Sequence, residues 1–487
     1  MGLKHHTHKA ISYPHLFSIR SSTILTLILF LACTIYLFAP VRRYPDHLSW
    51  PGGPGPFRGD LRDARFPWNK LCYGPAQEKL KVAVFSRTWP AGPSPGGMER
   101  HAYTLYSALA ARGHEIHVFT VPSDKKPHEE MLIRRANNVR LHFAPNDHGM
   151  LNCSHAFEIF RRENRAGAFD YVHTESVSLP HWRARTLPNV AVTWHGIWYE
   201  IMHSKLFQEL FWNPKGQLPG LMGELHEAMP RLIDEIKFFR RYTQHICISN
   251  SAGEVLTNIY QLPIRNVHVI LNGVDNKKFI QDPESGTKLR HRYGIPDNAS
   301  LVMGIAGRLV RDKGHPLLRE AFTKISKRHP DVFLLVAGSG PWGKRYAELG
   351  PTVKILGPLE ANELSDFYNA VDVFVDPTFR PQGLDLTLIE AMHCGTPVLT
   401  PNFPSITGTV VLNEGFGYTF SPNVKSLVEA METAIRDGVE VLERKGEVCK
   451  EYVASMFTAE KMASAYERFF LCMKNDKYCQ YPLPTDC

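Results

Sequence analysis

The chain has 487 residues, of which 44% are hydrophobic and 21% are charged. These values are typical of a folded globular protein, and they exclude a mostly disordered chain and a membrane protein with many spans. The 9 cysteines are too few for a disulfide-stabilised scaffold. The net charge of +8 is small for this length, so it suits an anionic ligand or a membrane surface and gives no argument for a nucleic acid.

An apolar segment near the N-terminus predicts a membrane anchor. No charged residue occurs over residues 21–41, and Arg42 and Arg43 follow directly. About 20 apolar residues cross a bilayer as a helix, so we expect a tail at 1–20 and a transmembrane signal anchor at 21–41. A cleaved signal peptide is the alternative, although its apolar region is usually shorter and the small residues of a cleavage site are missing here.

Basic residues lie equally on both sides of the apolar segment, so charge alone does not set its orientation. The short tail and the large C-terminal body are typical of a type II single-pass protein, with the body in the lumen of the Golgi or the ER. Residues 42–78 contain the run Pro51–Pro56, which cannot hold a helix, and are expected to form a stem. The cysteines that could pair in an oxidising lumen, or remain thiols, include Cys72, Cys472, Cys479 and Cys487.

Short apolar runs alternate with amphipathic stretches over the rest of the chain. Lys81–Phe85 and Glu115–Phe119 are expected to be buried strands on either side of a helix over Met98–Arg112, which is a βαβ unit of a parallel sheet. The other expected strands of this first series are Tyr171–His173, Val190–Trp194, His245–Ile248 and Val267–Ile270. The expected strands of a second series are Leu301–Ile305, Val332–Ala337, Val353–Leu356, Val373–Val375 and Pro397–Leu399.

The two series predict an α/β fold of two facing, doubly wound, Rossmann-like domains. We expect an N-terminal domain over 79–281, a C-terminal domain over 282–455, and a C-terminal helix and tail over 456–487, with a polar link near Asp282–Gly286. Residues 200–240 interrupt the alternation and predict an insertion, either extra core or a surface for an acceptor or a partner. A ligand is expected between the domains, at the C-terminal ends of the strands.

Two glycine-containing loops are candidates for anion binding. Gly96 and Gly97 precede the first helix, where backbone amides favour an anion. Gly307 follows the strand Leu301–Ile305 and opens a loop that carries Arg308 and Lys313, a planar guanidinium and a point charge that suit a diphosphate. Each loop could equally be an ordinary turn.

A third segment leads from Gly383 into an apolar helix with a single carboxylate, Glu390. A buried carboxylate needs partners, which ribose hydroxyls or a neighbouring helix could supply. His195 follows the strand Val190–Trp194, where a histidine either faces a ligand or is structural. The G-x-G-x-x-G match at Gly338–Gly343 follows a strand in the middle of its series, so it gives little support for a nicotinamide cofactor.

In this order and spacing, the segments resemble the family 4 glycosyltransferases of GT-B fold over about residues 80–470. The most specific part is Asp372–Pro397, which is similar to the family segment E-G-F-G-x-x-x-x-E-A-M-x-x-G-x-P-V. Asn272–Phe279 resembles the N-G-V-D-x-x-x-F turn, and Gly307–Gly314 resembles the G-R-L-x-x-x-K-G loop. The resemblance implies a nucleotide-sugar donor in the C-terminal domain and an acceptor on the N-terminal domain.

The resemblance also implies roles for individual residues. Arg308 and Lys313 would hold the donor diphosphate, Glu390 would bind the ribose, and His195 would lie near the transferred bond. The other positions implied in donor binding or catalysis are Gly96, Gly97, Gly307, Gln382, Gly383, Leu384, Asp385 and Leu386. Enzymes of this kind retain the anomeric configuration and usually need no metal and no cofactor, because the cations stabilise the leaving group.

The sequence departs from the family pattern at one place. Gln382 stands where the family usually has a glutamate, and Gly383-Leu384-Asp385 replaces the G-F-G turn. Gln382 can hydrogen-bond to a sugar but carries no charge, and Asp385 either adds a carboxylate near the phosphates or supplies the missing charge. We expect a metal-independent, retaining glycosyltransferase with an unidentified acceptor; the alternatives are a catalytically silent GT-B protein that binds a glycan or partner, and an epimerase on the same fold.

Overall fold

The computed structural model describes residues 58–64, 67–89, 96–121, 135–136, 139–147, 150–212 and 219–486. The expected tail at 1–20, the expected anchor at 21–41 and the first part of the expected stem lie outside these residues. None of the described helices combines the length and the apolar character that a bilayer crossing requires. From Arg58 onward the chain is one compact unit with two main sheets.

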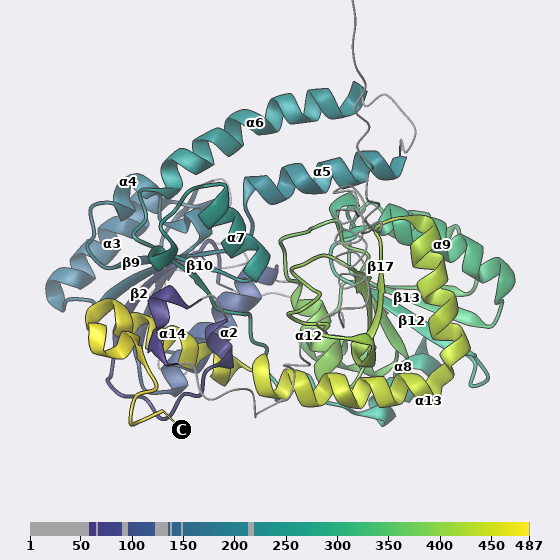
Figure 1. Ribbon diagram of the computed structural model, residues 1–487. Coiled ribbons are helices and arrows are strands. Elements are labelled where there is room, and N and C mark those ends of the chain that lie inside the picture. Colours follow the sequence, from purple (N-terminus) through teal and green to yellow (C-terminus); the bar gives the residue numbers. More distant parts are fainter. Residues whose placement is uncertain are drawn as a thin grey trace, which may run out of the picture. The chain divides into compact units, whose positions relative to one another are not determined.

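The first sheet has the strand order β11-β10-β9-β8-β2-β3-β5-β4 and is parallel except for the short edge strand β4 (Figure 1). Its strands are β2 (Lys81–Phe85), β3 (Glu115–Thr120), β4 (Arg135–Ala136), β5 (Val139–Phe143), β8 (Tyr171–Glu175), β9 (Val190–Trp194), β10 (Gln244–Cys247) and β11 (Val267–Val269). Val82 and Val84 face one core, and Ala83 and Phe85 face another, so β2 is buried on both faces as a central parallel strand must be.

Helices cover both faces of the first sheet. Leu105 of α2 and Phe469 of α14 (Ala459–Lys474) belong to one core, and Phe160 of α3 and Leu256 of α7 belong to the other. The bounds of the helices in this part of the chain are α2 (Gly97–Ala111), α3 (Cys153–Ala166), α4 (His181–Ala184), α5 (Trp198–Trp212), α6 (Pro219–Phe239) and α7 (Asn250–Asn258). Two short strands, β6 (Asn146–Asp147) and β7 (Met150–Leu151), form a separate hairpin.

The second sheet is entirely parallel, in the order β14-β13-β12-β15-β16-β17. Its strands are β12 (Leu301–Ala306), β13 (Val332–Ala337), β14 (Val353–Gly357), β15 (Val373–Val375), β16 (Val398–Pro401) and β17 (Gly417–Phe420). Its helices are α8 (Pro283–Arg292), α9 (His315–Arg328), α10 (Gly343–Ala347), α11 (Ala361–Asn369), α12 (Leu386–His393) and the first part of α13 (Val424–Met456). Helices again lie on both faces, so both sheets are doubly wound as the alternation predicts.

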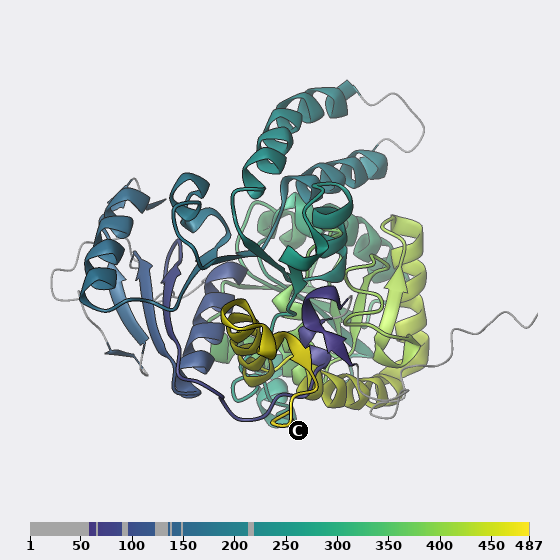
Figure 2. The same ribbon diagram turned by 60° about the vertical axis from the view of Figure 1, so that its left-hand side comes forward.

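The chain returns to the first sheet at its C-terminal end. Helix α13 is interrupted at Gly438 (φ 74°), and α14 (Ala459–Lys474) then packs beside α2 (Figures 1 and 2). Tyr466 and Phe469 of α14 are buried in the core of the first sheet. The helix expected in 456–487 is therefore part of the N-terminal lobe.

Part of the expected stem lies in the same core. Leu61, Trp68 and Leu71 are at most 4% exposed, and Trp68 packs edge-on against Phe469. The strand β1 (Gly59–Asp60) pairs with β18 (Gln480–Tyr481), close in sequence to the disulfide between Cys472 and Cys479. The proline and glycine content of 42–78 suggests a spacer throughout, but these apolar side chains give its second half a surface to bury.

The polar segment Asp282–Gly286, expected as a link, is the start of a helix. The Asp282 side chain accepts a hydrogen bond from the Ser285 N–H and so caps α8. Only Gly286 and Leu289 of α8 are buried, which explains why the sequence there is so polar.

The predicted insertion forms a pair of helices, α5 and α6, which lie side by side (Figures 1 and 2). The carboxylate of Glu235 in α6 accepts hydrogen bonds from the Trp198 N–H at the start of α5 (2.7 Å) and from the Tyr260 hydroxyl (2.5 Å). Phe207 and Phe211 of α5 pack against the core of the second sheet. The insertion thus adds to the core, and it also joins the two lobes.

Candidate active site

The start of α2 meets α12 through an ion pair. The Gly96 carbonyl accepts the backbone N–H of Arg100, and Nη1 of Arg100 lies 2.6 Å from Oε1 of Glu390. The Tyr368 hydroxyl donates a 2.8 Å hydrogen bond to Oε2 of Glu390. Both oxygens of the buried Glu390 thus have protein partners, which is one of the two arrangements that the sequence allowed. Each oxygen keeps a second lone pair, so a ribose hydroxyl could still bind.

The two glycines before and in the first turn of α2 differ in their surroundings. A Cβ on Gly96 would lie 2.5 Å from Oε2 of Glu99, whereas a Cβ on Gly97 would have no heavy atom within 4 Å. Space beside Gly97 leaves its backbone accessible at the N-terminus of a helix, where anions are favoured.

The two cations expected to hold a diphosphate have different environments. Arg308 is exposed and forms no ion pair with the part of the chain that the structure describes. Lys313, in the short helix η6 (Arg311–Lys313), contacts both carboxylate oxygens of Asp385. Burial would raise the pKa of Asp385, but Lys313, Arg380 and Arg308 together outweigh this effect and lower that pKa overall. Lys313 therefore faces a carboxylate where a phosphate was expected.

Two glycines in this region are required by close backbone contacts. Gly314 has φ 73°, and a Cβ there would lie 1.7 Å from the Pro377 carbonyl oxygen, so η6 can approach the loop after β15 only with glycine. Gly338 has φ 127°, and its Cβ would lie 1.8 Å from the Gly307 carbonyl oxygen. The G-x-G-x-x-G match therefore begins with a packing glycine that supports the Gly307 loop.

The loop from residue 382 to 386 is held from both lobes. Gln382 is 6% exposed, and its side-chain Nε2 lies 3.1 Å from Nδ1 of His203. The backbone carbonyl oxygen of Gln382 accepts a 2.6 Å hydrogen bond from the Ser249 hydroxyl. Leu384 and Leu386, expected near the donor, have side chains buried in the core around α12. Both are apolar and pack there, so only their backbone groups could contact a ligand.

A second ion pair in this region was not predicted. Nη2 of Arg380 lies 3.0 Å from Oε2 of Glu200 in α5, and Glu200 is 2% exposed. Burial raises the pKa of Glu200, while Arg380 opposes that rise. Burial, reinforced by the charge of Asp385, also raises the pKa of Asp376, which follows β15, to about 7. In the sequence, Glu200 and Asp376 could have been noticed in the same way as Glu390, because each is an acidic residue in an otherwise apolar stretch.

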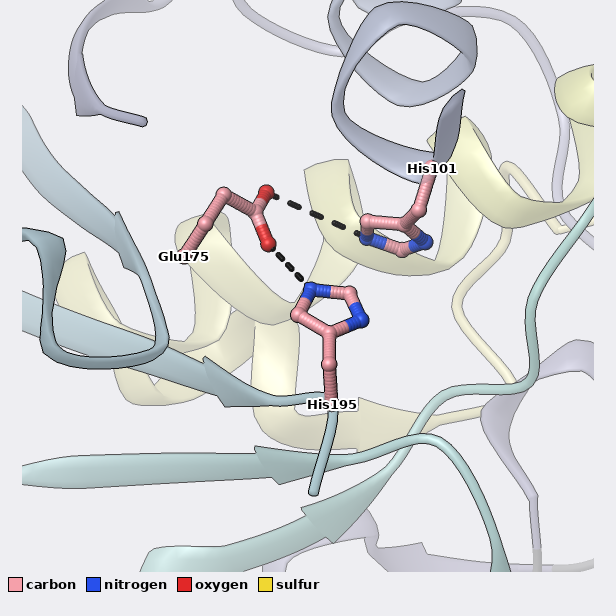
Figure 3. A group of neighbouring side chains, drawn as sticks. All are labelled: His101, Glu175 and His195. Atoms are coloured by element: carbon pink, nitrogen blue, oxygen red, sulfur yellow. Dashed lines mark hydrogen bonds and ion pairs between the residues drawn. The ribbon is translucent and has the colours of Figure 1, made fainter. Parts of the chain in front are cut away.

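His195 lies next to a buried carboxylate (Figure 3). Nε2 of His195 is 2.5 Å from Oε2 of Glu175, which ends β8 one strand away, and Nε2 of His101 from α2 is 3.9 Å from Oε1. Neither ring nitrogen of His101 has a hydrogen-bond partner among the described groups. The other ring nitrogen of His195 points away from Glu175 (Figure 3). Sequence analysis found His195 but neither of these neighbours.

Hydrogen bonds extend this group into the sheet. The Tyr106 hydroxyl donates to Glu175 and lies 2.6 Å from Nδ1 of His173, whose Nε2 lies 2.9 Å from the Thr193 hydroxyl. Burial would raise the pKa of Glu175, but His101 and His195 lower it to about 2. Burial lowers the pKa of His101 to about 3. Glu175 is therefore an ionised carboxylate at neutral pH, and His101 is neutral.

Two groups of described side chains have the geometry to hold a metal ion. They are His101, Glu175 and His195, and His117, His142 and Glu163, whose donor atoms lie within 4.8 Å of one another in each group. Neither has a spacing that is recognisable in the sequence, because the side chains come from separate elements. In the first group, an ion would have to replace the hydrogen bond between His195 and Glu175.

Two family models match the chain in tandem. The model of Glycosyltransferase Family 4 matches residues 95–278, and the model of Glycosyl transferases group 1 matches residues 287–453. The first match covers most of the first sheet, and the second covers the whole of the second sheet.

Named relatives have a low sequence identity to this chain but match most of its length. A D-inositol 3-phosphate glycosyltransferase of Xylanimonas cellulosilytica is 26% identical over 365 residues, which are 70% of this chain and 83% of the relative. Sucrose-phosphate synthase from Thermosynechococcus elongatus has a similar structure, with a TM-score of 0.62 and 21% identity over 81% of this chain and 98% of that one. HepE of Anabaena, solved in complex with UDP and glucose, matches with a TM-score of 0.58 and 16% identity over 81% of this chain and 100% of that one.

The predicted location is corrected by these comparisons. The relatives include proteins of bacteria and of an archaeon, which argues against the expected type II single-pass protein of the Golgi or ER. The expected anchor at 21–41 itself lies outside the described residues. Two family models in tandem, two Rossmann-like sheets and many glycosyltransferase relatives identify the chain as a glycosyltransferase of the GT-B fold that is similar to family 4.

Proposed function

We propose that the chain transfers a sugar from a nucleotide-sugar donor to an acceptor hydroxyl, with retention of configuration and without a metal ion. The observation that carries this proposal is the grouping of Arg308, Lys313 and Arg380 around the loops after β12 and β15, next to the N-terminus of α12. Cations at a helix N-terminus suit a diphosphate leaving group. The solved HepE structure, of the same fold, contains UDP and glucose.

In the proposed reaction, the bond between the anomeric carbon and the diphosphate lengthens while Arg308 and Lys313 bind the phosphate oxygens. Because the Lys313 ammonium has three N–H groups, it can donate to a phosphate oxygen and to Asp385 at the same time. The acceptor hydroxyl attacks the same face of the sugar, its oxygen forms the new bond, and its proton passes to a leaving-group oxygen. His195, oriented by the Glu175 carboxylate, faces the donor sugar, and Glu390 accepts a ribose hydroxyl.

The test is a panel of UDP-, GDP- and ADP-sugars, with release of free nucleotide as the readout and calorimetry for binding. We expect one donor to be hydrolysed slowly without acceptor, and R308A to slow that release about a hundredfold. Binding of no nucleotide and no donor would overturn the proposal and favour a silent GT-B protein, for which the uncharged Gln382 is the argument. An unchanged rate in excess EDTA is expected, and a loss that Mn²⁺ or Zn²⁺ restores would refute metal independence.

A further inference from the structure

Four polar atoms on α5 and in the loop after β15 are buried and have no hydrogen-bond partner among the described residues. They are Oε1 of Glu200, Oδ2 of Asp376, Oγ1 of Thr378 and Oε1 of Gln382. A buried polar atom without a partner destabilises the fold, so several such atoms together point to a ligand that completes their hydrogen bonds. Three of the four are carboxylate or amide oxygens, which accept hydrogen bonds, so the complementary ligand is rich in hydroxyl groups.

Glu200 lies between two predicted site residues. Its Oε1 is 2.7 Å from the point where a Cβ on Gly383 would be, so this oxygen lies beside the residue that follows Gln382. A Cβ on Gly196, which follows His195, would be 3.5 Å from Oε2 of Glu200. The carboxylate is therefore next to both segments that are expected to contact the donor sugar.

One face of α5 holds this carboxylate in place. Glu200, His203, Phe207 and Phe211 follow a helical spacing and so share a face. Their partners in the second lobe are Arg380, Gln382, Phe403 and Phe379, respectively. The two aromatic contacts and the two polar contacts fix the helix against the second lobe, so Glu200 has little freedom to leave its position.

We propose that Glu200 is a donor-sugar-binding residue that supplies from the N-terminal lobe the carboxylate absent at Gln382. Its free Oε1 accepts hydrogen bonds from sugar hydroxyls, and its charge, held by Arg380, faces the positive charge that develops on the sugar as the bond to the diphosphate breaks. This inference rests on the proposed function, because it concerns the donor of that reaction.

The other nearby carboxylates are less suited to this role. Asp385 has both oxygens in contact with the Lys313 ammonium. Asp376 lies on the same loop, but it forms no ion pair with a described residue, and burial together with the charge of Asp385 raises its pKa. Glu200 alone combines a guanidinium on one oxygen with a free second oxygen.

The experiment uses the full chain with UDP-glucose and UDP as probes, and compares E200Q, the double variant E200Q/Q382E and the control E227Q. Glu227 is exposed on α6, so its substitution keeps the charge change but leaves the site untouched. We expect E200Q to release UDP from UDP-glucose at least about tenfold more slowly, with UDP affinity within about twofold of wild type. The double variant, which returns a carboxylate to the neighbouring position, should recover to within about threefold of wild type.

An unchanged rate for E200Q, or an equal loss in E200Q and in the double variant, would overturn the role of Glu200. A parallel loss of UDP affinity would also overturn it, since UDP carries no sugar and the effect would then be structural. If E200Q does not fold by circular dichroism, E200D keeps the charge with a shorter reach, and a drop in rate without a drop in UDP affinity is expected. Failure of the wild type to bind any nucleotide of the panel and to hydrolyse any donor would instead refute the proposed function itself.

Discussion

Arg100 and Glu390 join the two lobes: Nη1 of Arg100 lies 2.6 Å from Oε1 of Glu390, with Glu390 2% and Arg100 21% exposed. The pair connects the first turn of α2 with the middle of α12. Removing one partner of a buried pair leaves a desolvated charge behind, which costs more than the pair itself contributes.

We therefore expect R100A to lower the free energy of unfolding by about 3 kcal/mol, because Glu390 then keeps only the Tyr368 hydroxyl as a partner. The double variant R100M/E390Q removes both charges, so its free energy of unfolding should fall clearly less than that of R100A. Urea denaturation of the three proteins checks this. A loss below about 0.5 kcal/mol for R100A would mean that solvent reaches Glu390 and that the pair does not link the lobes energetically.

Arg308 offers a test of catalysis that is separate from stability. The side chain is exposed and has no ion pair in the described part of the chain, so R308A should leave the melting temperature within about a degree of wild type. Turnover should fall about a hundredfold, because a cation that stabilises the leaving diphosphate is lost. Nucleotide release and thermal unfolding measure the two effects. Equal turnover in R308A and wild type would remove Arg308 from the site.

Asp385 competes with phosphate for the Lys313 ammonium. D385N keeps the size and hydrogen-bonding shape of the side chain but removes its charge, so we expect UDP to bind about tenfold more tightly. Calorimetry at two salt concentrations is the measurement, and the gain should shrink at high salt. Weaker binding of UDP to D385N would show that Asp385 positions Lys313 for the phosphate.

Glu235 makes stability depend on pH. Burial raises its pKa to about 7 against an ordinary value of 4.5, so between these values the folded chain holds a proton that the unfolded chain has lost. Stability contributed by this group is therefore lost as the pH rises through that window. E235Q should match wild type at pH 4 and be more stable by about 3 kcal/mol above pH 7. Denaturation at several pH values tests this, and a constant difference would argue against a raised pKa.

The sequence predicts strands well where both faces of a sheet are buried. Runs such as Val332–Ala337 are continuous apolar segments, and the structure has strands at those positions. β5 was missed because Arg140 and His142 interrupt its apolar residues near the sheet edge. The stem was extended too far because composition does not reveal that Trp68 packs against Phe469, a residue far along the chain.

The candidate site was predictable only where one loop carries several of its members. Arg308 and Lys313 share a loop, and Gln382 and Asp385 share another, so the resemblance of these two segments to the family indicates both. His101, Glu175 and His195 come from three separate elements, and their proximity depends on the strand order β9-β8-β2. The pairing of Glu200 with Arg380 depends on how α5 packs on the second lobe, which no local pattern encodes.

The return of α14 to the first sheet has a consequence for how the protein is made. The last strand of that sheet ends at Val269, but the face that α2 covers stays incompletely covered until Ala459–Lys474 has been synthesised. A ribosome adds roughly 5–20 residues per second, so the N-terminal lobe waits many seconds before Tyr171 can stack on Phe470 of α14. Chaperones that hold nascent chains would meet this face first. The yield of folded protein should therefore be more sensitive to changes in α14 than to changes in any other helix.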